Sequence, residues 1–176
     1  MLHTDLYQIN MAEVYYNQGI HNRTAIFDLY FRRMPFENGY AVFAGLERII
    51  DYLSNLRFTD SDIEYLRSQE YSEEFLGYLK SLKFTGNLRA VEEGEAVYNN
   101  MTIVQVEAPL AEAQLIETAL LNIVNYQTLI ATKASRIRQI TPNEKLMEFG
   151  SRRAHEFDAA IWGARAAIIG GFDGTS

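Results

Sequence analysis

The spacing of hydrophobic residues along the first part of the chain predicts a series of helices. Apolar positions recur three or four residues apart after Thr4-Asp5, and again from Leu46 to Leu53, which is the period of a helix with one buried face. Thr59-Asp60 and Ser72-Glu73 are suited to cap two further short helices. The first helix should end near Gly19, and none of these helices carries a cluster of reactive side chains.

Segments rich in β-branched and aromatic residues predict strands in two parts of the chain. Residues 25–31 and 40–44 are separated by a breaker segment from Met34 to Gly39, so an antiparallel pair is the simplest interpretation. Between Gly86 and Pro109, apolar residues are set between turn signals, which predicts three short strands of a small antiparallel sheet.

A long helix over residues 110–140 is predicted after these strands, with a break near residues 122–126. A boundary between an α+β domain and a following α/β domain is expected near Pro109, or at the latest at Pro142. The predicted domains are residues 1–109 and residues 110–176.

The last part of the sequence predicts one strand–helix–strand unit. A first strand should end at Phe149-Gly150, and the Ala- and Ile-rich run 159–169 favours a helix closed by Gly170-Gly171. A second short segment follows at residues 172–176. Ligands of parallel α/β sheets bind beyond the carboxyl ends of the strands. The aromatic and arginine residues after the first strand, and the hydroxyl residues after the second, are therefore candidates for binding.

One such unit cannot bury its apolar surfaces alone, because parallel strands are covered by neighbouring strands and by helices on both faces. The 176 residues are otherwise enough to form a proper core. We therefore expect the chain to be the N-terminal part of a longer enzyme, or to pair with a partner that supplies the missing strands.

The composition narrows the class of partner. A net charge of −7 and a pI near 5.0 argue against a broad nucleic-acid surface or a surface for anionic membranes. We see no long apolar run and no secretory signal, and the absence of cysteine fits a cytoplasmic protein. His3, His21 and His155 are too scattered in sequence to indicate a zinc site, so no metal ligands are predicted.

Three stretches together resemble the N-terminal part of the nicotinate phosphoribosyltransferase family. They are Thr4-Asp5-Leu6-Tyr7-Gln8, Glu148-Phe149-Gly150-Ser151-Arg152-Arg153-Ala154 and Gly170-Gly171-Phe172-Asp173-Gly174-Thr175-Ser176. Tyr40 to Glu47 and Glu93-Gly94-Glu95 lie between them and strengthen the match, which covers nearly the whole chain. The resemblance implies an α/β fold, with an N-terminal α+β domain followed by the start of an irregular α/β barrel of the type II phosphoribosyltransferase kind.

The resemblance also implies an activity. The family joins nicotinate to phosphoribosyl pyrophosphate in NAD salvage, giving nicotinate mononucleotide and pyrophosphate with hydrolysis of ATP. ATP is then a co-substrate, Mg²⁺ accompanies the diphosphate and the nucleotide, and a homodimer shares its active sites between subunits. The catalytic groups are unknown here, because the family's phosphorylated histidine is expected beyond Ser176; His155 is not that residue.

Four positions match substrate-binding residues of the family. Phe149 and, from the neighbouring subunit, Tyr7 would lie against the two faces of the pyridine ring. Arg152 would bind phosphate oxygens, and Ser176 would face the nicotinate carboxylate. From the residues alone, an aromatic at a strand end is more often part of a core, and adjacent arginines are usually solvated or ion-paired.

Two other functions remain open at this point. The first is an enzyme that acts on nicotinamide instead of nicotinate. The family of such enzymes has Asp where Ser176 stands, because a carboxylate can accept a hydrogen bond from the nicotinamide NH₂. Ser176 therefore favours nicotinate. The second is a non-catalytic fragment that serves as an interaction or assembly piece. The residues do not identify the catalytic acid groups or the ATP stoichiometry.

Overall fold

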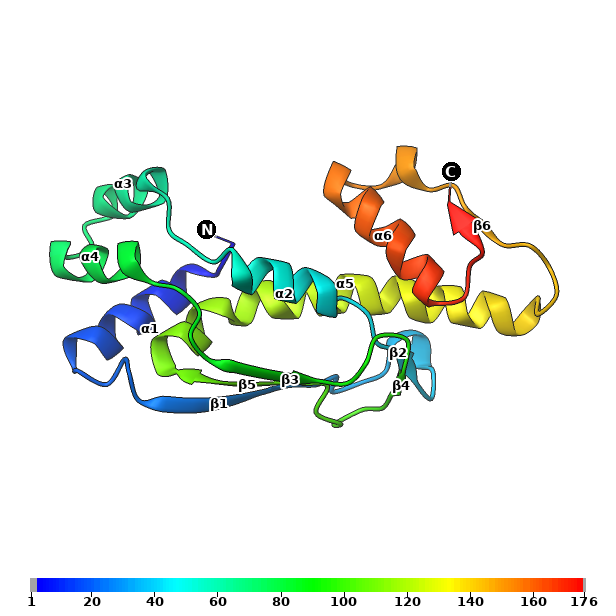
Figure 1. The fold of residues 1–176 in the computed structure, drawn as a ribbon, viewed down its shortest axis with the longest axis horizontal. Helices are drawn as coiled ribbons and strands as arrows, with labels where there is room; N and C mark the ends of the chain where they lie inside the picture. Colours follow the sequence, from blue (N-terminus) through cyan, green and yellow to red (C-terminus); the bar gives the residue numbers. More distant parts are fainter. Residues whose placement is uncertain (1–2, 176) are drawn as a thin grey trace. The chain divides into compact units, whose positions relative to one another are not determined.

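The structure is a computed structural model that describes residues 3–175 (Figure 1). Over these residues, none of the helices combines the length and apolar character that crossing a bilayer requires. The elements in chain order are α1 (Leu6–Asn17), β1 (Thr24–Leu29), a 3-10 turn (Pro35–Glu37), β2 (Ala41–Val42), α2 (Leu46–Ser54), α3 (Asp60–Ser68), α4 (Glu73–Ser81), β3 (Asn87–Ala90), β4 (Ala96–Val97), β5 (Val104–Pro109), α5 (Leu110–Ile140), β6 (Met147–Glu148), a second 3-10 turn (Ser151–Arg153), α6 (Phe157–Ile169) and β7 (Gly174–Thr175).

The chain divides into two compact units, which we describe separately. Over the described residues, the first unit consists of residues 3–28, 47–89 and 105–121, and the second consists of residues 29–46, 90–104 and 122–175. The predicted domain boundary near Pro109 coincides with the junction of β5 and α5. The division of the protein into domains at that point stays a prediction.

The predicted helices form the core of the first unit. The predicted helix starts are confirmed, because α3 follows Thr59 and α4 follows Ser72. Only the Thr59 side chain makes a capping hydrogen bond, since that of Ser72 accepts none from the start of α4. Thr59 and Asp62 form a capping box, in which each side chain binds the backbone N–H of the other. Side chains from α1, α3, α4 and the start of α5 are buried: Ile9, Ala12, Ile63, Leu66, Phe75, Leu76, Leu79, Ala111, Leu115 and Ile116.

The strand pairing differs from the prediction. β1 lies in a three-stranded sheet of order β1-β5-β3, whereas β2 pairs antiparallel with β4, with Ala41 opposite Val97. The segment between β1 and β2 is not a hairpin turn, because the two strands belong to different sheets. This segment contains a 3-10 turn in which Phe36 has a φ of 59°. The expected β1–β2 pair was therefore wrong, and so was the expected single sheet of β3, β4 and β5.

The predicted break in α5 was also wrong, since this helix is continuous over 31 residues. Residues 122–126 contain poor helix formers, but packing outweighs that weak local preference. Val124 is buried there, and the Tyr126 hydroxyl donates to the Ala159 carbonyl at 2.7 Å.

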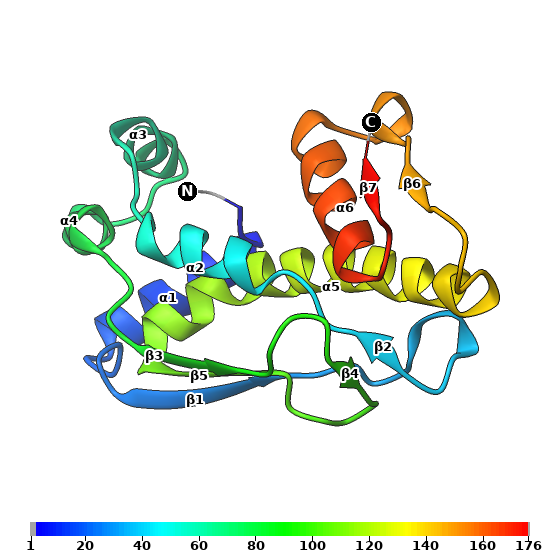
Figure 2. The ribbon, with the colours of Figure 1, turned by 45° about the vertical axis from the view of Figure 1, so that its right-hand side comes forward.

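The second unit contains the predicted strand–helix–strand motif. β6 and β7 are parallel and lie beside α6, with Met147 opposite Gly174 (Figure 2). α6 ends at Ile169 with Gly170 as its C-cap, as predicted, and Gly171 follows with a φ of 104°, a value that favours glycine. Small residues allow α6 to approach α5 closely: a Cβ on Gly163 would lie 3.0 Å from the Tyr126 hydroxyl.

Candidate active site

The carboxyl ends of β6 and β7 meet at one edge of the second unit, and Glu148 links them. Its carboxylate accepts the Gly150 backbone N–H, and the Thr175 hydroxyl donates to its other oxygen at 3.4 Å. Glu148 thus fixes the turn after β6 next to the end of β7. This is the edge where parallel α/β sheets bind ligands.

Arg138 on α5 holds the opposite ends of the two strands, where β6 and β7 begin. Its guanidinium donates to the Gly171 carbonyl at 2.7 Å, to the Glu144 carbonyl at 2.8 Å, and to the Asp173 carboxylate. Asp173 also accepts the Leu146 N–H at 2.7 Å, and this bond, followed by the Arg138 bond, lowers the Asp173 pKa. Asp173 is therefore a structural link between the two strand segments.

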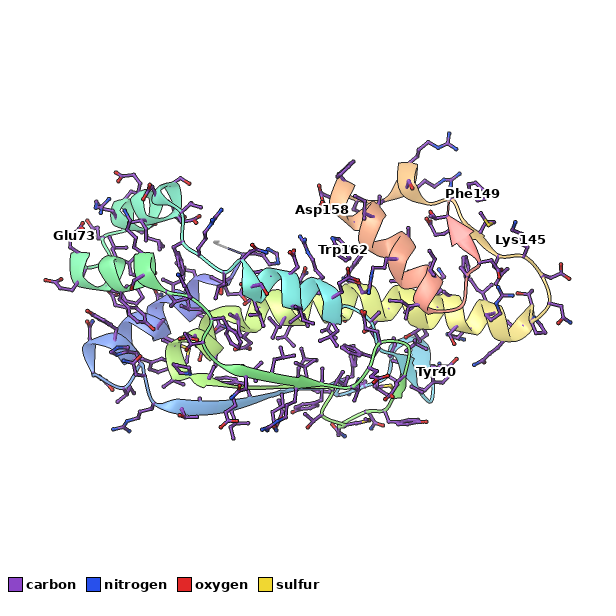
Figure 3. All side chains as sticks on the ribbon, in the orientation of Figure 1. Tyr40, Glu73, Lys145, Phe149, Asp158 and Trp162 are labelled. Carbon is purple, nitrogen blue, oxygen red and sulfur yellow. The ribbon has the colours of Figure 1, made fainter. Side chains whose placement is uncertain are left out.

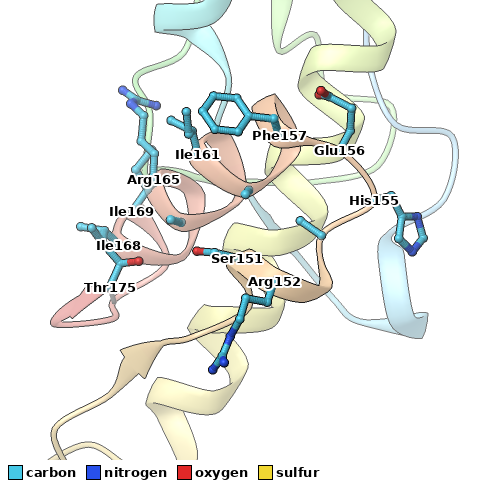
Figure 4. Close-up of a pocket in the computed structure, with 13 residues that line it drawn as sticks. Ser151, Arg152, His155, Glu156, Phe157, Ile161, Arg165, Ile168, Ile169 and Thr175 are labelled. Atoms are coloured by element: carbon cyan, nitrogen blue, oxygen red, sulfur yellow. The ribbon is translucent and has the colours of Figure 1, made fainter.

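A pocket of about 950 Å³ lies beside this edge, against α6 (Figure 4). Ser151, Arg152 and Thr175 contribute polar groups, while the α6 side of the pocket carries apolar side chains. Those apolar side chains are Phe157, Ile161, Ile168 and Ile169. In Figure 4 the Arg152 side chain extends away from Ile161 and Arg165 of α6.

The two pocket arginines have different surroundings. Arg165 donates to both carboxylate oxygens of Glu93, at 2.9 and 2.7 Å. Glu93 also accepts the Gly45 N–H at 2.6 Å and the Leu46 N–H at 3.0 Å. Burial raises the pKa of Glu93, but these bonds outweigh it and hold the pKa below its usual value. The Arg165 guanidinium already binds both carboxylate oxygens of Glu93. Arg152 is therefore better suited than Arg165 to bind an added anion.

The sequence-predicted residues are distributed as follows. Arg152 lines the pocket, whereas Arg153 is not one of the described residues that line it. Phe149 follows β6 and is 58% exposed; Figure 3 shows it at the strand end, apart from Asp158 and Trp162 of α6. It does not line the pocket. Ser176 lies outside the described residues.

Tyr7 belongs to the first unit, where it projects from α1 with 52% of its surface exposed. Its hydroxyl accepts a hydrogen bond from the Gln8 side chain at 3.0 Å. The contact between Tyr7 and Phe149 of another copy stays a prediction.

Sequence reasoning did not assign Glu93 or Arg165 to the site. The sequence nevertheless contains a feature that marks each of these two residues. Arg165 is the one cation in the otherwise apolar run from Ala159 to Ile169, and Glu93 begins the Glu93-Gly94-Glu95 stretch. Among residues 3–175, no group of three or more His, Asp or Glu side chains could hold a metal ion.

Comparison with known proteins identifies the family. Residues 2–125 match the nicotinate phosphoribosyltransferase (NAPRTase) N-terminal domain. Nicotinate phosphoribosyltransferase of Bacillus subtilis is 67% identical over 99% of this chain and 36% of that protein. The enzyme of Caenorhabditis elegans is 41% identical over 98% of this chain and 32% of its own length. The chain thus spans about a third of the length of these relatives.

Solved structures agree. The crystal structure of human nicotinic acid phosphoribosyltransferase matches all of this chain and 36% of that chain, with a TM-score of 0.92 and 38% identity. Nicotinate-nucleotide pyrophosphorylase from Pyrococcus furiosus shares the fold, with a TM-score of 0.77 at 24% identity. The predicted α/β fold class is confirmed. On this evidence the chain belongs to the nicotinate phosphoribosyltransferase family, whose N-terminal domain it contains.

Proposed function

We propose that the protein containing this chain is an ATP-coupled nicotinate phosphoribosyltransferase of NAD salvage. It would join nicotinate to phosphoribosyl pyrophosphate and release nicotinate mononucleotide and pyrophosphate. The observation that supports this most directly is the family match over residues 2–125, with Arg152 beside a pocket at the ends of parallel strands. We also propose that residues 1–109 form its N-terminal α+β domain and residues 110–176 the linking helices and first strand–helix–strand of its barrel.

Arg152 is proposed to bind the departing polyanion. Transfer of the ribosyl group breaks the C1–O bond through a cationic sugar centre, so charge builds up on the pyrophosphate as it leaves. A guanidinium presents a planar fork to phosphate oxygens, and Arg152 is exposed on the turn that Glu148 fixes. Arg152 would therefore orient the sugar diphosphate and stabilise its charge.

Phe149 and Tyr7 are proposed to hold the pyridine ring between them. Both side chains are more than half exposed, so each has a ring face available for stacking. In the proposed homodimer, Tyr7 of one subunit faces Phe149 of the other, and Ser176 donates to the nicotinate carboxylate.

Subunit mixing tests this shared arrangement. Tyr7→Ala and Phe149→Ala each damage every site in a dimer made of one variant. In a mixed dimer with shared sites, one site carries both changes and the other carries none. An equal mixture should then recover about a quarter of the wild-type activity, because half of the dimers are mixed. No recovery on mixing would place both residues in a site made by one subunit.

The co-substrates complete the proposal. ATP would be hydrolysed through a histidine located beyond Ser176. Mg²⁺ would arrive on diphosphate oxygens, which it prefers over an all-protein cage. The family resemblance also supports a cytoplasmic location.

The activity can be tested directly on the full-length protein. Nicotinate and phosphoribosyl pyrophosphate, with Mg²⁺ and with or without ATP, should yield nicotinate mononucleotide, detected by chromatography. ATP should increase the yield and be converted to ADP. Nicotinamide in place of nicotinate should give little product. Product from nicotinamide alone would identify the sister activity, and no product from either base would exclude both enzymes.

A further inference from the structure

The Tyr7 hydroxyl sits at the end of a buried polar network in the first unit. Gln8 is fully buried, and its side-chain NH₂ donates to the Tyr7 hydroxyl and to the Glu117 carboxylate, both at 3.0 Å. Gln114, which is 5% exposed, donates to the Gln8 carbonyl oxygen and to Glu117 at 3.2 Å. Both polar ends of the Gln8 side chain are therefore fixed by α5.

The start of α1 is fastened to α5 by a second contact. Thr118 donates to the Asp5 carboxylate at 2.8 Å, and the Asp5 N–H donates to the Thr118 hydroxyl at 3.3 Å. Asp5 and Gln8 thus hold the backbone on both sides of Tyr7. The Tyr7 ring, although half exposed, emerges from a fixed base.

The direction of these bonds determines what Tyr7 can offer. An amide NH₂ can only donate, so the Tyr7 oxygen is the acceptor of the Gln8 bond and its own proton remains available. Burial, then the Glu117 and Asp5 carboxylates, raise the Tyr7 pKa and keep the hydroxyl protonated. Within the described residues, the Tyr7 hydroxyl takes part in no hydrogen bond other than that from Gln8. A hydroxyl that accepts one hydrogen bond also becomes a stronger donor through polarisation.

We propose that Gln8, held by Glu117, is a positioning residue that presents the Tyr7 hydroxyl as a hydrogen-bond donor to an oxyanion of a bound substrate. The proposal rests on the function proposed above and adds a polar role to the ring contact of Tyr7. The oxyanion belongs either to the carboxylate of nicotinate or to a phosphate of the sugar diphosphate.

Kinetics of the full-length enzyme separate these possibilities. Tyr7→Phe removes only an exposed hydroxyl, and a hydrogen bond to a charged acceptor gives about a ten- to hundred-fold effect. We expect kcat/KM to fall by that factor, with KM rising for the substrate that carries the oxyanion. Tyr15→Phe is the control, because it also removes a tyrosine hydroxyl from α1 and the hydrogen bond that this hydroxyl donates to Gln114 is long, at 3.4 Å. It should change kcat/KM less than two-fold.

A double-mutant cycle tests the role of Gln8. Gln8→Met keeps the side-chain length and removes its donor, so alone it should lower kcat/KM by about as much as Tyr7→Phe. In the Tyr7→Phe background it should have almost no further effect, because the hydroxyl that it positions is gone. If Gln8→Met does not fold, Glu117→Gln replaces it in the same cycle, with an expected loss of a few-fold.

The outcomes distinguish this inference from the proposed function. An equal effect of Gln8→Met in both backgrounds means that Gln8 serves only the fold, and the inference fails. If Tyr7→Phe is silent while Tyr7→Ala raises KM for nicotinate, the ring contact stands and the donor role is wrong. If Tyr7→Ala is silent as well, Tyr7 has no part in the site.

Discussion

Glu93 and Arg165 form a paired fork in which the two terminal guanidinium nitrogens donate to different carboxylate oxygens, at 2.9 and 2.7 Å. The same carboxylate accepts the N–H groups of Gly45 and Leu46, where α2 begins. The Glu93 side chain is 17% exposed and that of Arg165 is 29% exposed. The Glu93 carboxylate therefore fixes both the start of α2 and the guanidinium of Arg165, which lines the pocket.

Glu93→Gln should destabilise the protein by about 1–3 kcal/mol, because the Arg165 charge would lose its charged partner. The stabilisation that ionised Glu93 gives the folded wild-type protein should depend on pH. The folded pKa of Glu93 is lowered below its unfolded value of about 4.3. The contribution is therefore present above about pH 4.3 and is lost as the pH falls through the folded pKa.

Denaturant unfolding between about pH 3 and 7 measures this dependence. The difference in unfolding free energy between wild type and Glu93→Gln should shrink at the acid end. Glu92→Gln, a change at the exposed neighbouring position, is the control and should give a difference close to zero at every pH. A Glu93→Gln effect that does not vary with pH would contradict an ionised Glu93.

A glycine at the end of α6 provides a second test. Gly170 has an ordinary φ of −74°, so alanine suits its backbone. A Cβ there would lie 2.6 Å from the Ala134 Cβ and overlap the Ala131 carbonyl. Gly170→Ala should therefore push α6 away from α5 and cost about 1–3 kcal/mol.

Gly77 is the matched control, because it lies within α4 and an added Cβ would meet nothing within 4 Å. Gly77→Ala should stabilise the protein by about 0.5–1 kcal/mol, since alanine loses less backbone entropy in a helix. Urea midpoints of the two variants should move in opposite directions. A Gly170→Ala midpoint at or above the wild-type value would show that the α5–α6 contact tolerates the methyl group.

The elements that could be predicted from the sequence are those with local signals. Thr59 and Ser72 mark helix starts, and the run 159–169 followed by Gly170-Gly171 marks α6, because caps and spacing act within a few residues. Strand partners lack such a signal: β2 is two residues long, and its pairing with β4 depends on distant packing. Arg165 was missed for the same reason, since its partner Glu93 is 72 residues away in sequence.

The candidate site was predictable where motif and fold agree. The edge formed by β6 and β7 follows from the strand–helix–strand pattern, and Arg152 lies beside the pocket there. The roles of Phe149 and Tyr7 depend on a bound base and a second subunit, neither of which one chain's contacts encode. Those roles stay predictions.

Arg152 and Arg153 allow a sharp comparison, because they are adjacent in one 3-10 turn, where successive side chains point about 120° apart. Arg152→Lys keeps the charge but loses the fork, so kcat/KM for phosphoribosyl pyrophosphate should fall about ten-fold or more. Arg153→Lys should have little effect. Steady-state kinetics of both variants decide between them, and the reverse order of effects would assign the phosphate contact to Arg153.

The last prediction concerns Ser176 and the choice between nicotinate and nicotinamide, and it rests on the family resemblance. A serine hydroxyl can donate to the nicotinate carboxylate and bears no charge that opposes it. Aspartate at this position would place two negative charges close together. At an effective dielectric constant of about 20 and a separation of about 4 Å, they repel by roughly 4 kcal/mol as an upper guide.

Ser176→Asp in the full-length enzyme should therefore raise KM for nicotinate sharply, and the new carboxylate could accept a hydrogen bond from the amide of nicotinamide. Kinetics with both bases measure the change in preference, and Ser176→Asn, which adds the same bulk without charge, separates charge from size. Nicotinate binding should be lost far more in the Asp variant than in the Asn variant. Equal loss in both would mean that the pocket excludes bulk at this position, and an unchanged preference for nicotinate would mean that Ser176 does not contact the carboxylate.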